Sequence, residues 1–429
     1  MKKVSMRAFS ALLMAFLIVI GLFIYVARYV KDGESWALFF DQATTGSEYT
    51  ITDRNGVILA KMGGGEKSYA EDAATRVANY HVTGDYTGNV GTGALSSFKS
   101  ELSGFNLITG IEERDDVTMA LTVDAELDRV AYEALNGRKG AVMMYNYKTG
   151  EVLCMVSSPS IDPLSPPEAL PDGAYINRCI SASFVPGSVF KLVTLTAAIE
   201  NMPDLYHRSF SCAGSVDVKG VAINCTGTHG QQSIEQALSN SCNCAFAEIA
   251  LELGPDIISD YAKKLGITES LDFDGIETRA GNYSKDESLS AAMAWSGIGQ
   301  SEDLVCPYAM MRLAGAYANG GKVVEPSMLG ESGKTTQLMS SDTAEKVASM
   351  MNYTVVYHYG SSRFPGLNIS AKTGTAEVGN GQASHGWFVG FLNDDAHPYA
   401  FVCLVENGGS GLGAAGTVMN TVLQAAVNR

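Results

Sequence analysis

A long run of residues without charge lies near the start of the chain. Residues 8–27 read AFSALLMAFLIVIGLFIYVA. A helix of about 20 apolar residues can cross the hydrocarbon core of a bilayer. A cleaved signal peptide is the alternative, but its apolar core is usually about 7–15 residues long and precedes a small-residue cleavage site. The length of this run, and the bulky residues VARYV at its end, favour an uncleaved membrane anchor.

Alternation of apolar and polar positions begins after this run. The segments YTIT and VILA flank the turn residues 53–56 (DRNG), which predicts a β-hairpin that ends at the glycines 63–65. Residues 66–118 are rich in Gly and Asn and show no long helical period. We therefore expect a small irregular module next to the membrane, at residues 28–120.

From residue 121 onward, strand and helix patterns come in blocks. The segment after Asp124 has apolar residues at helical spacing, which predicts a capped helix. GAVMMYNY and EVLCMVSS predict a hairpin, residues 188–350 are mainly helical with a helix that stops at Gly254, and three strand patterns and a helix at 414–427 follow. Strands at both ends of a helical middle predict one antiparallel sheet, so we expect an α+β domain at residues 121–429.

Charge adds an orientation and excludes one class of partner. The net charge of −16 argues against nucleic acid as a ligand. Residues 1–7 carry three basic side chains and no acid, whereas Arg28 and Lys31 beyond the apolar run are offset by Asp32 and Glu34. By the positive-inside rule, residues 1–7 are then cytoplasmic and the bulk of the chain lies outside a single-pass anchor.

The most informative polar pair is Ser188 and Lys191, in PGSVFKLVTLTAAIE. A Pro-Gly turn before an apolar stretch predicts a buried helix that begins at the serine, with both side chains on one face. A desolvated lysine can take the proton of a serine hydroxyl, and the start of a helix favours developing negative charge. One S-x-x-K is a weak signal, however, and Ser96 and Lys99 form another.

Order separates the first motif from its rival. Ser241-Cys242-Asn243 follows Ser188, and Lys372-Thr373-Gly374-Thr375 follows in turn. The succession of S-x-x-K, an S-D-N type element and K-T-G is a signature of class A β-lactamases and penicillin-binding proteins. A second K-T-G, at residues 148–150, precedes Ser188 and is interpreted as a turn between two strands.

With these motifs the chain resembles the class B penicillin-binding proteins, which are membrane-anchored peptidoglycan D,D-transpeptidases. The resemblance covers essentially the whole chain. It implies a penicillin-binding/β-lactamase-like fold, with a five-stranded antiparallel sheet and helices on both sides. It is carried by ITDRNGVILA, LTVDAELDRVAYEAL, GAVMMYNYKTGEVLCMVSSPSIDPL, NRCISASFVPGSVFK, SIEQALSNSCNCAF, GIGQSEDLVCPYAMM and AKTGTAEVGNG…HGWFVGF.

The resemblance also implies a role for the motif residues. Ser188 would attack the carbonyl of the penultimate D-alanine in a donor stem peptide, with Lys191 as base. Ser241 would relay a proton to the leaving amine, and Asn243 would hold the peptide amide. The K-T-G segment, Lys372, Thr373, Gly374 and Thr375, would steer protons and the substrate carboxylate, and the N–H groups of Thr375 and Ser188 would form the oxyanion hole.

Implied partners are stem peptides, β-lactam antibiotics, the cell membrane, and a polytopic glycosyltransferase of the shape, elongation, division and sporulation (SEDS) family. No cofactor or metal is expected.

The chain departs from the family at Glu48-Tyr49, where Arg-Gly is usual, and in the short module at 28–120. A β-lactamase or β-lactam sensor is the second reading, but no E-x-x-x-N element lies between Ser241 and Lys372. A catalytically silent cell-wall scaffold is the third.

The eight cysteines fall into two groups. Those at 154, 179, 306 and 403 lie in apolar runs and are expected to be buried thiols. In the second group, we favour a buried thiol for Cys242, while a disulfide with Cys225 or Cys212, or between those two, stays open. A zinc site from Cys212, Cys225 and His229 lacks a common zinc-motif spacing. His385 is expected to be a hydrogen-bonded structural residue. Cys244 completes the second group.

Overall fold

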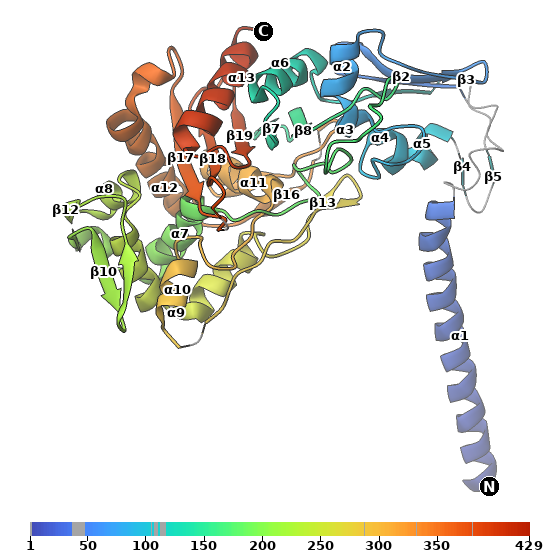
Figure 1. The fold of residues 1–429 in the computed structure, drawn as a ribbon. Helices are drawn as coiled ribbons and strands as arrows, with labels where there is room; N and C mark the ends of the chain where they lie inside the picture. Colours follow the sequence, from blue (N-terminus) through green and yellow to red (C-terminus); the bar gives the residue numbers. More distant parts are fainter. Residues whose placement is uncertain are drawn as a thin grey trace.

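The computed structural model describes residues 2–36, 48–103, 105–106, 110–111, 117–286, 288–331, 333–379 and 381–429. Helix α1 (Lys2–Trp36) extends away from the rest of the chain in Figure 1. Its segment Ala8–Tyr29 is long and apolar enough to cross a membrane, and its side chains are exposed. This segment includes the predicted span at 8–27.

The described chain between α1 and the main sheet, where the membrane-proximal module is predicted, contains a four-stranded sheet in the order β3-β2-β1-β6. Strands β1 (Tyr49–Thr52) and β2 (Ile58–Gly63) form the predicted hairpin. The hairpin ends at Gly63, so its predicted end at the glycines is confirmed. A Gly64-Gly65 turn then leads to β3 (Glu66–Tyr69), which pairs with β2, and β6 (Val117–Ala120) pairs in parallel with β1. Parts of the predicted module at 28–120 lie outside the described residues. The described remainder holds α2 (Ala73–Ala78), α3 (Tyr80–Thr83), α4 (Ala94–Ser97), α5 (Lys99–Ser103), β4 (Phe105–Asn106) and β5 (Gly110–Ile111).

The main sheet is five-stranded, and each neighbouring pair is antiparallel. Its order is β17-β18-β19-β7-β8. The β7–β8 hairpin, from the start of the domain, thus lies beside the three strands β17 to β19, from its end. The α+β fold with this sheet is therefore confirmed. The strands are β7 (Gly140–Asn146), β8 (Val152–Ser158), β17 (Ile369–Ala376), β18 (His385–Leu392) and β19 (Tyr399–Val405).

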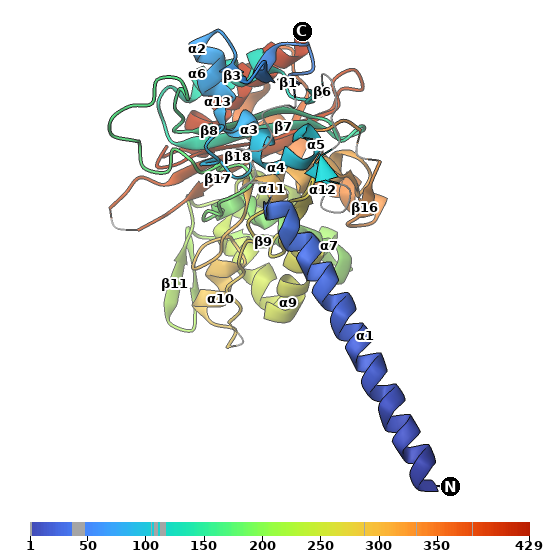
Figure 2. The ribbon, with the colours of Figure 1, turned by 90° about the vertical axis from the view of Figure 1, so that its right-hand side faces the viewer.

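Helices cover both faces of this sheet, and the apolar residues divide into a core on each side (Figure 2). On one face lie α6 (Ala125–Leu135), capped by Asp124 as predicted, and α13 (Thr417–Val427), which a π-helical turn at Gly411–Gly416 precedes. On the other face, α11 (Pro307–Ala318) contacts β7, β18 and β19. Beside it, α12 (Ser341–Thr354) packs against β17. The rest of the helical middle contains α7 (Lys191–Asn201), α8 (Ile234–Ser239), α9 (Asn243–Lys264) and α10 (Ala291–Ser296).

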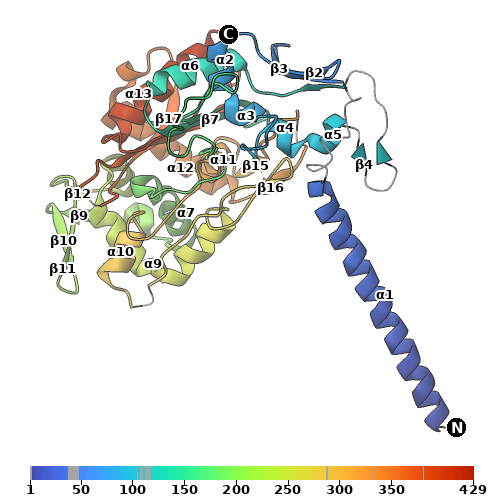
Figure 3. The same cartoon turned by 45° about the vertical axis from the view of Figure 1, so that its right-hand side comes forward.

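In the helical middle, the first part of α9 ends at Gly254, as predicted: this residue has a non-helical backbone with φ 81° and ψ 163°, and a second helical part follows it from Pro255. Small antiparallel sheets also interrupt the segment read as mainly helical, and β10–β11 projects beside α9 and α10 in Figure 3. The paired strands are β9 (Phe210–Cys212) with β12 (Gly230–Gln232), β10 (Ser215–Val218) with β11 (Val221–Asn224), β13 (Asp272–Phe273) with β14 (Ile276–Glu277), and β15 (Lys322–Val324) with β16 (Thr335–Gln337).

Candidate active site

Ser188 lies in a single 3-10 turn, Gly187–Val189, just ahead of α7. The predicted helix therefore begins at Lys191 rather than at the serine. The lysine still reaches back, and its Nζ lies 3.0 Å from Ser188 Oγ. Gly187 makes this turn possible, because it has φ 55° and a Cβ there would lie 2.9 Å from Thr375 O.

Lys191 is fully buried at the centre of the site. Its Nζ donates to Ser241 O at 2.7 Å and to Asn243 Oδ1 at 2.7 Å, and lies 3.3 Å from Ser241 Oγ. Burial disfavours the charged ammonium and lowers the pKa of Lys191 to about 7. A neutral amine, which can accept a proton from the adjacent serine, is therefore accessible near neutral pH.

The Ser-Cys-Asn segment joins α8 to α9. Ser241 has φ 52°, an unusual conformation for a residue other than Gly, Asn or Asp, and its N–H donates to Leu238 O at 3.0 Å. Asn243 opens α9, and its Nδ2 donates to Asn224 O at 2.8 Å. This bond orients the amide so that its oxygen faces Lys191.

Strand β17 brings the K-T-G segment to the same place. Lys372 is fully buried, and its Nζ donates to Ser241 Oγ at 3.0 Å and to Thr373 O at 2.9 Å. Burial, reinforced by the nearby Lys191, holds the pKa of Lys372 well below its usual range. Ser241 Oγ thus lies between two lysines. A Cβ at Gly374 would lie 2.6 Å from Pro186 O, so this strand packs closely on the turn that carries Ser188.

The backbone of β17 leaves donors free of the sheet. This strand is at the sheet edge, and the Thr373 N–H donates to the Tyr359 hydroxyl at 2.8 Å rather than to β18. Because alternate residues of a strand point the same way, the Thr375 N–H also faces away from β18. The Thr375 hydroxyl accepts from Gly411 N at 3.3 Å. The structure therefore brings all eight predicted site residues together around Ser188.

Sequence reasoning missed three residues that hold this arrangement. Tyr359 anchors the edge strand through Thr373, and nothing in VVYHYG signalled it. Gly299 accepts from Gly187 N at 2.8 Å, and a Cβ there would lie 2.1 Å from Gly187 O; its place in GIGQ was the available signal. Trp387 was expected only to pack the sheet, but its Nε1 also donates to Val185 O at 2.9 Å, just before the serine turn.

The rival motifs lie elsewhere. Ser96 and Lys99 belong to α4 and α5 of the membrane-proximal part, and residues 148–150 form the turn between β7 and β8, as predicted. His385 accepts from Asn407 N at 3.1 Å and stacks edge-on with Phe184. These contacts fit the structural role expected for that histidine.

The cysteines follow the predicted grouping. The four in apolar runs are buried, as expected. In the second group, Cys242 is buried, its Sγ lies 3.8 Å from Cys225 Sγ, and Cys212 Sγ lies 3.5 Å from Cys244 Sγ. These four thiols are free in the structure and adjoin Asn243, whose N–H donates to Cys225 Sγ at 3.2 Å.

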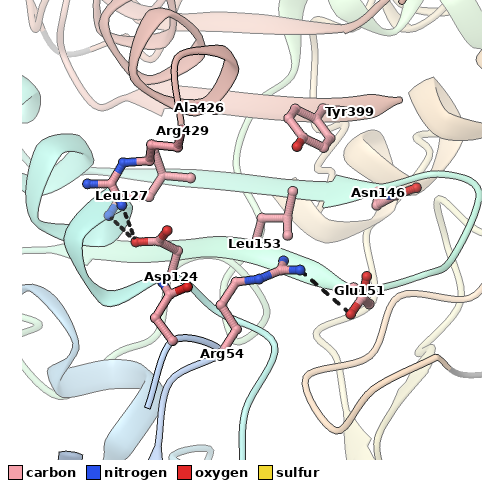
Figure 4. Close-up of a pocket in the computed structure, with 10 residues that line it drawn as sticks. Arg54, Asp124, Leu127, Asn146, Glu151, Leu153, Tyr399, Ala426 and Arg429 are labelled. Carbon is pink, nitrogen blue, oxygen red and sulfur yellow. Dashed lines mark hydrogen bonds and ion pairs between the residues drawn. The ribbon is translucent and has the colours of Figure 1, made fainter. Parts of the chain in front are cut away.

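A cavity of about 290 Å³ lies apart from these motifs, where the β1–β2 turn meets α6, the β7–β8 hairpin and the end of the chain (Figure 4). Arg429 bonds Asp124 at 2.6 Å, and Arg54 faces Glu151 at 3.9 Å. Each arginine in its wall thus faces a carboxylate, and none of the predicted site residues lines it. We interpret it as a junction between the two parts of the chain.

Comparison with known families decides the identity of the main domain. Residues 140–424 match the penicillin binding protein transpeptidase domain. The chain belongs to this family. The resemblance to class B penicillin-binding proteins is thereby confirmed, and the matched transpeptidase segment contains Ser188, Ser241 and Lys372.

Individual relatives agree with this family. The chain is 26% identical over 348 residues to peptidoglycan D,D-transpeptidase PbpA of Mycobacterium tuberculosis, covering 71% of this chain and 70% of that protein. It is 27% identical to stage V sporulation protein D of Bacillus subtilis, covering 71% of this chain and 52% of that protein.

Solved structures share the fold. Penicillin-binding protein A of M. tuberculosis, as a penicillin G acyl-enzyme complex, matches with a TM-score of 0.74 at 24% identity, over 89% of this chain and 99% of that chain. The D,D-transpeptidase domain of a peptidoglycan glycosyltransferase from Eggerthella lenta matches with a TM-score of 0.76 at 24% identity, with the same coverage.

Proposed function

We propose that this protein is a membrane-anchored peptidoglycan D,D-transpeptidase that cross-links stem peptides through an acyl-enzyme on Ser188. One observation carries the proposal. Ser188 Oγ lies 3.0 Å from the buried Nζ of Lys191, whose pKa is lowered to about 7 by burial. A nucleophile beside a base that is partly neutral at the working pH meets the first requirement of serine acyl transfer.

The acylation step follows from these contacts. Lys191 Nζ takes the Ser188 proton as Oγ attacks the carbonyl carbon of the penultimate D-alanine. The N–H groups of Ser188 and Thr375 stabilise the oxyanion, an effect typically worth about 10²–10³-fold per donor. Collapse breaks the peptide C–N bond, and a proton passes through Ser241 Oγ to the leaving D-alanine amine.

The second step transfers the acyl group. The amine of another stem peptide attacks the Ser188 ester and gives up a proton to Lys191 through Ser241 Oγ. As the ester C–O bond breaks and the cross-link forms, Lys191 returns that proton to Ser188 Oγ. Asn243 holds the donor amide, while Lys372, Thr373 and Thr375 bind the substrate carboxylate. The Gly374 backbone packs on the turn that carries Ser188, and so fixes the distance between strand β17 and the nucleophile. β-Lactams enter the same first step and remain attached to the serine.

The chain layout supports an extracytoplasmic site. We propose a cytoplasmic tail at 1–7, an anchor at 8–27, a membrane-proximal module at 28–120 and the transpeptidase domain at 121–429. The positive charges before the apolar span support this orientation. By family analogy, the anchor and module dock on a glycosyltransferase of the SEDS family, which polymerises the glycan that this chain cross-links.

Labelling with a fluorescent penicillin tests the proposal on the full-length protein in detergent. We expect a stable covalent adduct that is lost in Ser188→Ala and kept in Ser96→Ala, the matched serine of the second S-x-x-K. Rapid release of hydrolysed drug would assign the chain to the β-lactamases instead. If the unsubstituted protein forms no adduct, the result would favour the third interpretation, a catalytically silent cell-wall scaffold.

A further inference from the structure

Four side chains with metal-binding atoms converge beside the Ser-Cys-Asn segment. The ligand atoms of Cys212, Cys225, His229 and Cys242 all lie within 4.8 Å of one another. They come from four places in the fold: the end of β9, the residue after β11, the residue before β12 and the N-cap of α9. Two small hairpins and the start of a long helix therefore meet at one point.

The two distances from Cys225 within this cluster fit the edges of tetrahedral zinc coordination. Cys225 Sγ lies 3.8 Å from Cys242 Sγ and 3.5 Å from His229 Nδ1. Zinc bonds of about 2.3 Å to sulfur and about 2.0–2.1 Å to nitrogen give tetrahedral edges of about 3.8 Å and about 3.5 Å. A disulfide between Cys225 and Cys242 would instead require a sulfur separation of about 2.05 Å.

The surroundings also suit thiolate ligands. The Asn243 N–H donates to Cys225 Sγ at 3.2 Å, and the Cys244 thiol lies 3.5 Å from Cys212 Sγ, where it can donate to a thiolate. Such outer hydrogen bonds are the usual support of metal ligands. A set of three sulfurs and one imidazole favours zinc among the common divalent metals.

We propose that Cys212, Cys225, His229 and Cys242 bind one zinc ion. Binding releases the three thiol protons to solvent and leaves three thiolates and a neutral imidazole on the metal. The sequence expectation of no metal is thereby replaced: it rested on ligand spacing and did not include Cys242, which completes the set.

The site would position catalytic groups rather than perform chemistry itself. Cys242 stands between Ser241 and Asn243, and Asn243 also bonds the chain next to Cys225 through Asn224 O. An ion at this point ties the β9–β12 and β10–β11 hairpins to the start of α9, and so fixes both polar side chains against Lys191. This positioning role rests on the proposed function, whereas zinc binding itself does not.

Elemental analysis of the full-length protein, purified in detergent without chelators, tests the site. We expect about one zinc per chain. Cys212→Ser and Cys225→Ser should each lower the zinc content at least about tenfold. Cys306→Ser is the matched control, because this buried cysteine occupies a helix N-cap, where serine is well accommodated, and it should keep the full content.

Two further measurements use the unsubstituted protein, so they do not require the variants to fold. Cobalt exchanged for zinc should give thiolate-to-metal charge-transfer bands and tetrahedral d–d bands. Zinc removal should slow acylation by fluorescent penicillin at least about tenfold, and added Zn²⁺, but not Mg²⁺, should restore the rate.

The outcomes separate the zinc site from the enzymatic function. Purified protein without zinc that takes up neither Zn²⁺ nor cobalt, zinc retained in both ligand variants, or a Cys225–Cys242 disulfide in the peptide map would overturn the site. Zinc loss with unchanged acylation would overturn the positioning role alone. Stoichiometric zinc in a protein that no penicillin acylates would contradict the proposed function and still support the zinc site.

Discussion

The chemistry of the site depends on how two buried lysines share one serine hydroxyl. Ser241 Oγ lies 3.3 Å from Lys191 Nζ and 3.0 Å from Lys372 Nζ. Burial lowers the pKa of each lysine, and for Lys372 the charge on Lys191 adds to the effect. Two ammonium groups this close disfavour each other, so one amine is held neutral. A base next to Ser188 and a proton path through Ser241 follow from that arrangement.

Removing the amine beside the nucleophile tests this at the level of one residue. Lys191→Met keeps an unbranched side chain that ends one atom short of the lysine amine, and so deletes the base. We expect the second-order rate constant of acylation by penicillin to fall about 10²–10⁴-fold, the usual contribution of a positioned base. Lys99→Met, at the corresponding position of the second S-x-x-K, should change it less than twofold. Equal effects of the two substitutions would remove Lys191 from the mechanism.

A buried acid far from the motifs makes a prediction about stability. Asp128 on α6 is fully buried, accepts from Met155 N at 2.9 Å and lies beside the Cys154 thiol, and burial raises its pKa to about 8. The nearby carboxylates of Asp124 and Asp53 act in the same direction. The folded protein therefore keeps a proton that the unfolded chain releases, so stability falls as pH rises from about 4 to about 8.

Asp128→Asn should abolish this dependence while keeping an acceptor for Met155 N. The free energy of unfolding of the variant, relative to that of the unsubstituted protein, should increase as pH rises from 5 to 8, by up to about 1.4 kcal/mol per pH unit. Thermal melting across that range measures the difference. The same exchange at the exposed Asp172 serves as control. Parallel curves for Asp128→Asn and the unsubstituted protein would refute the assignment.

At the scale of elements, the site is held where an edge strand meets a turn. Strand β17 packs on the turn of Ser188 with no room for a Cβ at Gly374, and Gly299 closes the other side of the same turn. These are backbone approaches, so they set the position of Ser188 more firmly than side-chain contacts could.

Gly299→Ala tests this close approach. The new Cβ would lie 2.1 Å from Gly187 O, so the serine turn must shift by about 1 Å, which can cost about 10²-fold in rate. Gly88→Ala is the control, since Gly88 has the same φ of 78° with open space around it. Both variants carry the backbone cost of about 1–2 kcal/mol in the free energy of unfolding. Only Gly299→Ala should slow acylation.

Local patterns predicted the elements that carry a strong hydrophobic signal. The five strands of the main sheet and the helix capped by Asp124 followed from apolar runs and turn residues. The same patterns also predicted the interruption of α9 at Gly254. They could not predict β9 to β12, which are three or four residues long. Those features depend on tertiary packing, which overrides local propensity over such short segments.

The candidate site was predictable for a different reason. The order of the motifs identified Ser188, Ser241 and Lys372, which lie far apart in the sequence. Tyr359 was not predictable, because it acts through Thr373, which only the fold brings near. The grouping of the cysteines was predictable, but not that Cys242 joins Cys212, Cys225 and His229 in one cluster.

At the scale of the whole molecule, the proposed placement of the domain at a membrane rests on the apolar part of α1. Its side chains are exposed, and a surface of this length and hydropathy is unfavourable in water. In the proposed layout a bilayer removes that cost and holds the transpeptidase domain at the membrane surface. The net charge of −16 is compatible with a site that faces solvent outside the membrane.

Deleting residues 8–29 tests this placement. We expect the full-length chain to stay in the membrane fraction after an alkaline carbonate wash and the deleted chain to appear in the soluble fraction. Immunoblotting of the fractions measures the distribution, and penicillin labelling of the soluble form checks that its domain remains folded. Extraction of the full-length chain by carbonate would contradict an integral anchor.

The location of the drug adduct tests the central claim most directly. The full-length protein would be acylated with penicillin G, digested, and mapped by tandem mass spectrometry. The account predicts one penicilloyl group per chain, on the hydroxyl of Ser188 in the peptide that contains PGSVFK. An adduct on Ser241, on Ser96 or on a cysteine, with Ser188 unmodified, would contradict it.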